Sequence, residues 1–462
     1  MRNDPGYFPL PLGGERSEGG AAGRGEGGVT CCDIFCNVID NYGDIGVCWR
    51  LARQLANEHG LAVRLWVDDL NSLAKLCPET DAVLERQRCR GVEVYLWRKE
   101  FPDVQPADVV IEAFSCKLPQ GYIEAMAAQE HKPVWINLEY LSAEDWVEGC
   151  HKLPSPHPSL PLTKYFFFPG FTPKTGGLLL ERDLLARRDA FQNNTAQRQA
   201  FWQSIGMKMP SAETLKISLF AYENAALHGL FDVWAAGTQP VLCLVPEGRI
   251  LQQAGRYFGD DEPRVGNDFV RGKLQVRVLP FVEQERYDEL LWACDVNFVR
   301  GEDSFVRAQW AGKPFIWQIY PQHDAVHLKK LKAFLNLYNE QLSRSASQAV
   351  QDLWRAWNSG DLNTQTPLDP PLSGGAAHSP PLVLPLTRGL GGWGGREGFN
   401  ATGQAASTGS GQAWPAFITE RGELERHAQD WSRQLAENNL ALNLLDFSKE
   451  IGRMRALKIE GQ

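Results

Sequence analysis

The sequence predicts an α/β protein made of two Rossmann-like units. Short apolar runs alternate with longer stretches that carry apolar residues at helical spacing, which is the pattern of parallel strands joined by helices. The chain of 462 residues is longer than one ordinary hydrophobic core organises, so two units are expected. Hydrophobic residues make up 43% and charged residues 22% of the chain, as in ordinary globular proteins.

The first unit is expected over residues 31–200. It begins with the strand Asp33–Ile39, and Val47–Leu55 has the spacing of the helix that follows. The segment His151–Pro173 is rich in proline and aromatic residues, and it predicts an ordered connecting loop whose apolar residues pack between the units. The other strands expected here are Ala62–Val67, Val92–Trp97, Val109–Ile111 and Pro133–Asn137.

The second unit is expected over residues 201–362, with its first strand near Leu215. Asn224–Trp234 and Gln284–Ala293 are expected helices between its strands. Two such units facing each other across a cleft form the GT-B architecture of many glycosyltransferases, and a single long doubly wound sheet is the alternative. The expected strands are Lys216–Phe220, Val241–Val245, Leu274–Leu279, Val296–Val299 and Pro314–Trp317.

Three segments lie outside the two units. Residues 1–30 are rich in glycine and lack the apolar core of a secretory signal, so a disordered extension is expected. Residues 363–413 are rich in proline and then in glycine and serine, which predicts a disordered insert on which activity does not depend. Residues 414–462 are helical in pattern, and the last helix is expected to return to the first unit.

Composition and charge narrow the classes of partner. The formal net charge of −9 disfavours nucleic acid and suits a basic protein partner. No apolar run approaches the roughly 20 residues of a membrane-spanning helix, so no membrane partner is expected. The ten cysteines are scattered without metal-site pairing, which favours free thiols in a reducing cytoplasm.

The most informative turn is Arg300-Gly-Glu-Asp-Ser304, between the strand Val296–Val299 and the expected helix Phe305–Ala311. The first backbone N–H groups of a helix lack internal partners and favour negative charge. Arg300 adds a planar donor fork suited to phosphate, and Ser304 is a plausible helix N-cap. The turn therefore predicts an anion-binding site, with a simple helix cap and a surface ion pair as the alternative.

A second strand–turn–helix segment carries two carboxylates. Asp40 and Asp44 flank the turn after the first strand, at the carboxyl end of the expected sheet. The turn does not match the glycine pattern of dinucleotide-binding proteins. A catalytic base is one interpretation of the pair, and a helix-capping acid is the other.

Four motifs together resemble one family. They are Ile39-Asp-Asn-Tyr-Gly-Asp-Ile-Gly46, Leu138-Glu-Tyr-Leu-Ser-Ala-Glu144, Tyr165-Phe-Phe-Phe-Pro-Gly-Phe171 and Arg300-Gly-Glu-Asp-Ser304. In this order they are similar to EarP, the bacterial protein-arginine rhamnosyltransferases that modify translation elongation factor P. The resemblance runs from about Cys32 to Asn358 and resumes from about Trp414 to Lys449.

The resemblance implies an inverting transfer of L-rhamnose from dTDP-β-L-rhamnose to an arginine of elongation factor P, which activates that factor to relieve ribosomes stalled at polyproline. It implies no cofactor and no metal, and the sequence offers only Asp68-Asp69 as a metal-binding-like pair. Asp44 matches the family base, Asp40 a second active-site acid, and Glu302 a residue that binds sugar hydroxyls or the ribose.

The resemblance also implies a donor site in the second unit. Arg300, Ser304 and Tyr320 would donate to the diphosphate, and Asp303 matches a family site residue that simple capping would also explain. The base would lie among aromatic side chains, although aromatic residues at strand ends are more often part of a core. The residues of this base pocket are Phe220, Tyr222, Phe281, Gln284 and Tyr287.

Two other classes of function stay open at this point. One is a GT-B glycosyltransferase or epimerase-like enzyme that uses another nucleotide sugar. The other is a non-catalytic module that binds elongation factor P or a nucleotide, although a module of that kind needs no base.

Overall fold

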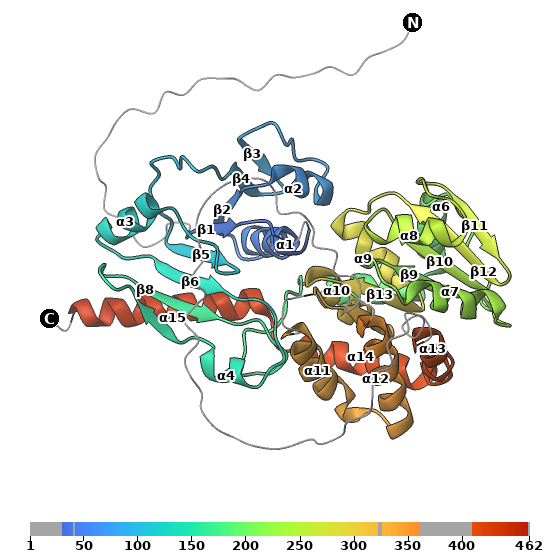
Figure 1. Ribbon diagram of the computed structural model, residues 1–462. Coiled ribbons are helices and arrows are strands. Elements are labelled where there is room, and N and C mark those ends of the chain that lie inside the picture. The colour runs from blue at the N-terminus through green and yellow to red at the C-terminus, as the bar shows by residue number, and fades with distance from the viewer. Residues whose placement is uncertain (1–29, 40–41, 322–325, 360–408, 461–462) are drawn as a thin grey trace, which may run out of the picture.

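The computed structural model describes residues 30–39, 42–321, 326–359 and 409–460. Asp40, nearly all of the N-terminal extension and most of the 363–413 insert lie outside the described residues. The described chain forms two α/β units that lie side by side (Figure 1). This arrangement confirms the predicted GT-B architecture of two Rossmann-like units.

The first unit is built on an eight-stranded sheet with the order β3-β4-β2-β1-β5-β6-β8-β7. Its inner strands are parallel, and the edge strands β3 and β7 run antiparallel to their neighbours. The strands are β1 (Cys31–Cys36), β2 (Ala62–Val67), β3 (Arg86–Cys89), β4 (Val92–Leu96), β5 (Val109–Ala113), β6 (Val134–Leu138), β7 (Pro154–Pro156) and β8 (Thr163–Phe167). The helices are α1 (Gly43–Asn57), α2 (Leu70–Leu76), α3 (Gln120–Ala128) and α4 (Trp146–Cys150).

The prediction that His151–Pro173 is only a connecting loop is wrong. This segment contains β7 and β8, and β8 pairs in parallel with β6 to extend the first sheet. The rings of Tyr165 and Phe167 on β8 pack against Phe447, at 5.4 and 5.9 Å between ring centroids. Phe447 comes from the last helix of the chain, so the local sequence does not show the surface that covers this strand.

The second unit is built on a six-stranded sheet with the order β11-β12-β10-β9-β13-β14. Its strands are parallel except for the edge strand β11. The strands are β9 (Leu215–Leu219), β10 (Val241–Pro246), β11 (Asp268–Arg271), β12 (Leu274–Leu279), β13 (Val296–Arg300) and β14 (Phe315–Gln318). The helices that precede or alternate with them are α5 (Leu184–Asn193), α6 (Thr195–Ser204), α7 (Leu227–Ala236), α8 (Ile250–Tyr257), α9 (Gln284–Ala293) and α10 (Asp303–Ala311).

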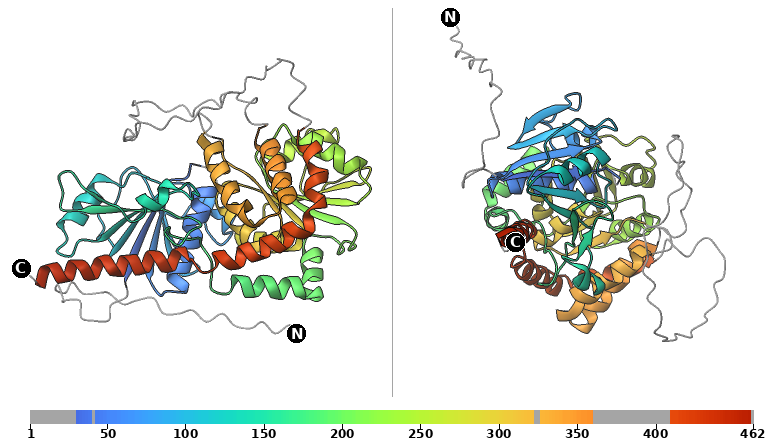
Figure 2. Two further views of the ribbon diagram at one scale, coloured as in Figure 1. Left: turned by 90° about the horizontal axis from the view of Figure 1, so that it is seen from below. Right: turned by 90° about the vertical axis from the view of Figure 1, so that its left-hand side faces the viewer.

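The C-terminal helices join the two units. The helix α15 (Leu440–Glu460) runs along the first unit, whereas α13 (Gly409–Thr419) and α14 (Arg421–Leu435) lie on the second (Figure 2). No helix in the described ranges is long and apolar enough to cross a membrane. The remaining elements of the second unit are α11 (Val326–Tyr338), the short 3₁₀ helix η2 (Asn339–Gln341) and α12 (Arg344–Ser359).

Helix α13 begins inside the range 363–413 that the sequence assigns to a disordered insert. The buried hydroxyl of Ser410 donates a hydrogen bond of 2.9 Å to the carbonyl of Ala226. Gly411 packs so closely on the second unit that an added Cβ would lie 2.6 Å from the carbonyl oxygen of Gly229. These contacts order residues 409–413, and glycine and serine are needed for the close approach rather than for flexibility.

Candidate active site

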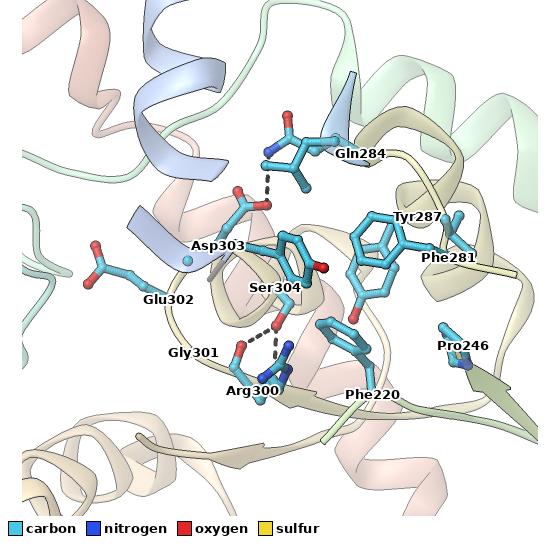
Figure 3. Close-up of a pocket in the computed structure, with 14 residues that line it drawn as sticks. Phe220, Pro246, Phe281, Gln284, Tyr287, Arg300, Gly301, Glu302, Asp303 and Ser304 are labelled. Atoms are coloured by element: carbon cyan, nitrogen blue, oxygen red, sulfur yellow. Dashed lines mark hydrogen bonds between the residues drawn. The ribbon is translucent and has the colours of Figure 1, made fainter. Parts of the chain in front are cut away.

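A cavity lies between the two units, with an empty volume of about 580 Å³. The first unit contributes Tyr42, Gly43 and Leu76 to the walls. Most of the predicted site residues line it as well, namely Phe220, Phe281, Gln284, Tyr287, Arg300, Glu302, Asp303 and Ser304 (Figure 3).

The 300–304 turn connects β13 to α10. Gly301 has φ +61°, a left-handed conformation that favours glycine. The interpretation of Ser304 as the N-cap is wrong, because Glu302 occupies that position and Ser304 lies inside the helix. The hydroxyl of Ser304 instead donates to the carbonyl of Arg300 and accepts from its N–H, so it fixes the turn on the end of the strand.

The guanidinium of Arg300 is the clearest sign of an anion site. The residue is only 5% exposed, yet its Nε and Nη1 atoms have no hydrogen-bond partner in the described chain. The guanidinium carbon lies 4.6 and 4.5 Å from the ring centroids of Phe220 and Tyr222. Leaving buried charged donors unpaired costs more than the roughly 1–3 kcal/mol of a neutral group, so an anionic ligand would stabilise this arrangement.

Aromatic rings form the apolar wall of the cavity. Phe220 packs edge-on against Tyr287, with ring centroids 5.6 Å apart. Phe281 meets Tyr42 of the first unit at 4.8 Å, so this wall spans both units. A planar base can stack on such rings.

Tyr222 and Tyr320 lie outside the walls of the cavity. Their rings meet edge-on, with the ring centroids 5.6 Å apart. Tyr222 also contacts the guanidinium of Arg300. Tyr320 is 40% exposed. The structure therefore places the Tyr222 ring against the Arg300 guanidinium, and the partly exposed Tyr320 against Tyr222.

Asp44 lies in the first turn of α1 and is 3% exposed. Its carboxylate accepts a hydrogen bond of 2.9 Å from the N–H of Ile39, which ties the segment after β1 to the start of the helix. Burial raises the pKa of the Tyr140 phenol above its ordinary value, and the charges of Asp44 and Glu302 and a hydrogen bond to Asp44 add to the shift. The negative charge of Asp44 therefore raises the pKa of a neighbouring side chain, the Tyr140 phenol.

Glu302 points away from the aromatic wall toward the first unit (Figure 3). Its carboxylate accepts a hydrogen bond of 3.1 Å from the N–H of Leu141, in the loop after β6. The pKa of Glu302 is raised to about 8. Desolvation by burial is the largest cause, and the charges of Asp44 and Asp303 act in the same direction. Asp44 is not one of the residues that line the cavity, but its charge acts on Glu302, which lines it from the other unit.

Buried ion pairs hold α1 against the start of α10. The Nε atom of Arg50 donates to Asp303 at 2.8 Å, and Nη1 of the same residue donates to Glu181 at 3.2 Å. Arg307 bonds both Glu181 and Asp288, at 2.6 and 2.7 Å for its closest contacts. Asp303 therefore lines the cavity as predicted, with its carboxylate paired to Arg50.

The amide of Gln284 joins the same contact. Its Nε2 atom donates to the carbonyl of Gly46 at 3.0 Å and to Asp303 at 3.3 Å, and its Oε1 atom accepts from Arg53 at 3.2 Å. An added Cβ on Gly46 would lie 3.2 Å from Gln284 Nε2, so glycine permits this close approach of α1. Gln284 lines the cavity, but its amide binds the first unit.

Sequence reasoning missed two residues of this region, Arg50 and Tyr140. Arg50 lies in an ordinary amphipathic helix, and nothing local distinguishes an arginine that pairs with residues over 100 positions away. Tyr140 lies in the motif 138–144, which was a usable signal. A second signal is visible only in the structure, because Phe114, which stacks on Tyr140 at 4.5 Å, has the unusual φ of +55°.

The acidic pair Asp68-Asp69 has structural partners. Asp68 accepts from the N–H of Val38 at 2.8 Å, and Asp69 caps α2 by accepting from Asn71 and Ser72. Within the described ranges, one group of three potential metal ligands lies close together, Cys77, Glu79 and Cys89, and none of these three residues lines the cavity.

Comparisons with known proteins agree on one family. The family model of the elongation factor P (EF-P) rhamnosyltransferase EarP matches residues 32–449. A protein-arginine rhamnosyltransferase of Pseudomonas putida is 49% identical over 417 residues, covering 90% of this chain and 97% of the relative. The corresponding protein of Pseudomonas aeruginosa is 52% identical over 328 residues, covering 71% of this chain and 87% of the relative.

A solved structure agrees with these relatives. It concerns EarP-mediated arginine glycosylation of translation elongation factor EF-P, and it is 37% identical to this chain with a TM-score of 0.59. The match covers 91% of this chain and 99% of the solved one.

Proposed function

Because the chain belongs to the EarP family of elongation factor P rhamnosyltransferases, we propose that it transfers L-rhamnose from dTDP-β-L-rhamnose to an arginine side chain of translation elongation factor P. The transfer inverts the anomeric carbon. The observation that carries the proposal is Arg300, whose buried guanidinium has two nitrogen atoms without a hydrogen-bond partner among the described residues, beside an aromatic cavity.

The proposal gives the donor one orientation along the cavity. Its diphosphate lies against Arg300 and the N-terminal end of α10, where backbone donors and the helix dipole favour negative charge. Its thymine lies against the ring of Phe281. As the bond to rhamnose breaks, charge grows on the diphosphate, and Arg300 is already in place to stabilise it.

The acceptor is an arginine guanidinium, which is a very weak acid, and this limits what a catalytic base can do. An arginine guanidinium has a pKa near ~13.8, so a neutral nucleophile at pH 7 costs about 9 kcal/mol. Asp44 does not remove the proton in advance. Its carboxylate orients the guanidinium by a charge-assisted hydrogen bond and takes the proton late, as the nitrogen bonds to carbon and becomes more acidic.

Glu302 and Tyr140 complete the acceptor side of this proposal. Glu302, with a pKa of about 8, is mostly protonated in the free enzyme at neutral pH. A bound guanidinium cation favours the ionised form of Glu302. Binding of the acceptor therefore creates a second negative charge, beside that of Asp44, which helps to hold the guanidinium. Tyr140 keeps Asp44 oriented through the hydrogen bond between the two side chains.

The cytoplasm is the proposed place of action, and no metal ion or cofactor takes part. All ten cysteines are free thiols, which suits a reducing compartment. Arg300 supplies the positive charge that a cation would otherwise bring to the diphosphate.

The test is a product assay with the full-length protein, dTDP-β-L-rhamnose and elongation factor P. Intact-mass spectrometry should show the mass of one deoxyhexose added to the factor, and peptide mapping should place it on one arginine. UDP-sugars tested in parallel should give no product. Transfer from a UDP-sugar alone would favour another glycosyltransferase, and dTDP binding without any product would favour a non-catalytic module.

A further inference from the structure

Two cysteines from different elements of the first unit meet beside the cavity. Cys77 follows α2 and Cys89 ends β3, and their sulfur atoms lie 3.1 Å apart. This is closer than the ~3.5–4.0 Å at which non-bonded carbon atoms attract best, whereas a disulfide bond is about 2.05 Å long. A small approach of two short segments would therefore close the pair into a disulfide.

Polar groups surround this pair on the side toward solvent. The buried hydroxyl of Thr80 has no hydrogen-bond partner of ordinary geometry among the described residues, and it acts on Cys89 in the direction that favours the thiolate. The carboxylate of Glu79 lies 3.8 Å from the Cys89 sulfur, and the Glu79 side chain is 59% exposed. Cys77 and Cys89 are themselves 0% and 4% exposed, so the pair is shielded from solvent and Cys89 is the less buried of the two.

A metal ion suits the same group less well. Two sulfur ligands at about 2.3 Å from a tetrahedral zinc ion lie about 3.8 Å apart, which is wider than this pair. The third ligand, Glu79, is already held by Arg90 at 3.0 and 3.1 Å. A structural zinc site also takes a fourth protein ligand, and the described residues offer three.

We propose that Cys77 and Cys89 are a reversible oxidation site, a dithiol that hydrogen peroxide converts into an intramolecular disulfide. The Cys89 thiolate attacks one peroxide oxygen, the O–O bond breaks, and Cys89 becomes a sulfenic acid as one water leaves. The Cys77 sulfur then attacks the Cys89 sulfur, the S–O bond breaks, and a second water leaves. The two thiols lose two electrons and two protons, the peroxide is reduced to water, and a thiol reductant reverses the change.

The pair is stable as a dithiol until an oxidant accumulates. Burial, followed by the hydrogen bond and charge of Cys77, raises the pKa of Cys89 to about 12. Little thiolate is then present at neutral pH, so the first step is slow. This property separates the site from a cysteine that reacts with any passing oxidant.

The site is also placed next to the cavity and to the contact between the units. Leu76, directly before Cys77, lines the cavity. Arg90, directly after Cys89, pairs with Glu285 at 3.0 Å and with Glu283 at 3.5 Å, both in the second unit. A disulfide between Cys77 and Cys89 therefore fixes two neighbouring segments of the first unit. One carries Leu76 to the cavity, and the other carries Arg90 to the second unit.

The experiment uses the reduced full-length protein, exposed to hydrogen peroxide, quenched, alkylated and digested without reduction. Trypsin leaves Cys77 in the peptide 76–86 and Cys89 in the dipeptide 89–90, so the linked pair has its own mass. The expected result is this linked peptide, formed with loss of two hydrogen atoms and removed by dithiothreitol. The melting temperature of the oxidised protein should rise by roughly 5 °C, because the new bond closes a loop of the unfolded chain.

Variants separate this site from general oxidation. Cys77→Ser and Cys89→Ser should each abolish the linked peptide, and Cys150→Ser, a half-buried cysteine elsewhere, should leave its yield unchanged. Three results would overturn the proposal: oxygen added to Cys89 without a link, a link between other cysteines, or one zinc ion per purified chain that is lost in Cys77→Ser. The peptide map of the unaltered protein decides the question even if a variant does not fold.

Discussion

Arg50 of α1 and Asp303 of α10 form an ion pair of 2.8 Å across the boundary between the two units. Arg50 is six positions after Asp44 on the same helix, and Asp303 directly follows Glu302 in the turn that carries Arg300. The pair therefore joins the element that presents the proposed base to the element that binds the proposed leaving group. We infer that the relative position of base and donor depends on it.

Replacing Arg50 should destabilise the protein strongly. In Arg50→Gln the carboxylates of Asp303 and Glu181 lose a partner in a buried site, and breaking a buried pair in this way costs about 3–5 kcal/mol. Scanning calorimetry should show a melting temperature lower by roughly 6–20 °C. Dissociation of dTDP should also become faster, because the turn that binds the diphosphate loses its fixed position.

Arg187→Gln is the control for this change. Arg187 pairs with Asp183, four positions earlier, and the two side chains are 43% and 67% exposed, so its loss should cost about 1 kcal/mol or less. Equal melting temperatures for Arg50→Gln and Arg187→Gln would show that the buried pair does not hold the units together.

Arg300→Ala should weaken the binding of dTDP but hardly change the binding of thymidine. Only dTDP carries the diphosphate that meets the guanidinium, and a hydrogen bond to a charged group is worth ~1.5–3 kcal/mol. Phe281→Ala should weaken both ligands by about 1–3 kcal/mol, since both carry the thymine that stacks on the ring. Titration calorimetry of both ligands with both variants measures the difference.

Arg249→Ala controls for the loss of a nearby positive charge. Arg249 is exposed and lies over the same Tyr222 ring, at 5.7 Å, but it does not line the cavity. Its removal should leave dTDP affinity within about twofold, the size of a screened surface interaction. If Arg300→Ala binds dTDP as tightly as the parent does, the phosphate site lies elsewhere.

Glu302→Gln should change the pH dependence of stability. The folded-state pKa of Glu302 is raised from 4.5 to about 8, so its stabilising contribution is complete below pH 4.5 and is lost as the pH rises through about 8. The glutamine variant avoids that loss. Its melting temperature relative to the parent should therefore be higher at pH 9 than at pH 4.5, by roughly 2–6 °C, in melts recorded across this range.

The titration of Glu302 should also shape the pH dependence of kcat/KM. Since kcat/KM reports the free enzyme, its value for elongation factor P should rise with pH through about 8 and then level, and Glu302→Gln should lack this rise. Glu289→Gln is the control, because burial also raises the pKa of that carboxyl but it lies away from the cavity. A kinetic rise near pH 8 that survives in Glu302→Gln would assign it to another group.

Transfer should continue in excess chelator. The proposed diphosphate site uses Arg300 and backbone N–H groups, and Asp68 and Asp69 are already bound to backbone donors of the first unit. The measurement is the initial rate with and without EDTA after removal of free ions. A rate that falls with EDTA and returns with magnesium or manganese would point to a cation site that this account lacks.

The sequence predicted the elements that local patterning determines. Apart from β8, the parallel strands of both sheets appear within three residues of their expected bounds, because continuous apolar runs between turn residues are a local property. It did not predict β8, whose covering surface on α15 is formed nearly 300 residues later. It also placed the start of α13 too late, because Ser410 is ordered by contact with Ala226 rather than by its neighbours.

The candidate site shows the same division. Local motifs identified the turns of Asp44 and Arg300, whereas Phe220, Phe281, Gln284 and Tyr287 of the cavity wall came from the family resemblance. Their partners depend on contacts between segments far apart in the chain. Tyr140 meets Asp44 within the first unit, and Arg50 meets Asp303 where the two units pack. That packing also explains why Gln284 lines the cavity while its amide binds α1.

The central claim is that the carboxylate of Asp44 serves as the base for transfer to arginine, and Asp44→Asn tests it most directly. The amide keeps the size of the side chain and an acceptor for the N–H of Ile39, but it loses charge and basicity. The measurement is a time course of the intact mass of elongation factor P with dTDP-β-L-rhamnose, with dTDP affinity determined in parallel. The account predicts a rate lower by at least roughly 100-fold with nearly unchanged dTDP affinity, and comparable turnover by the variant and the parent would contradict it.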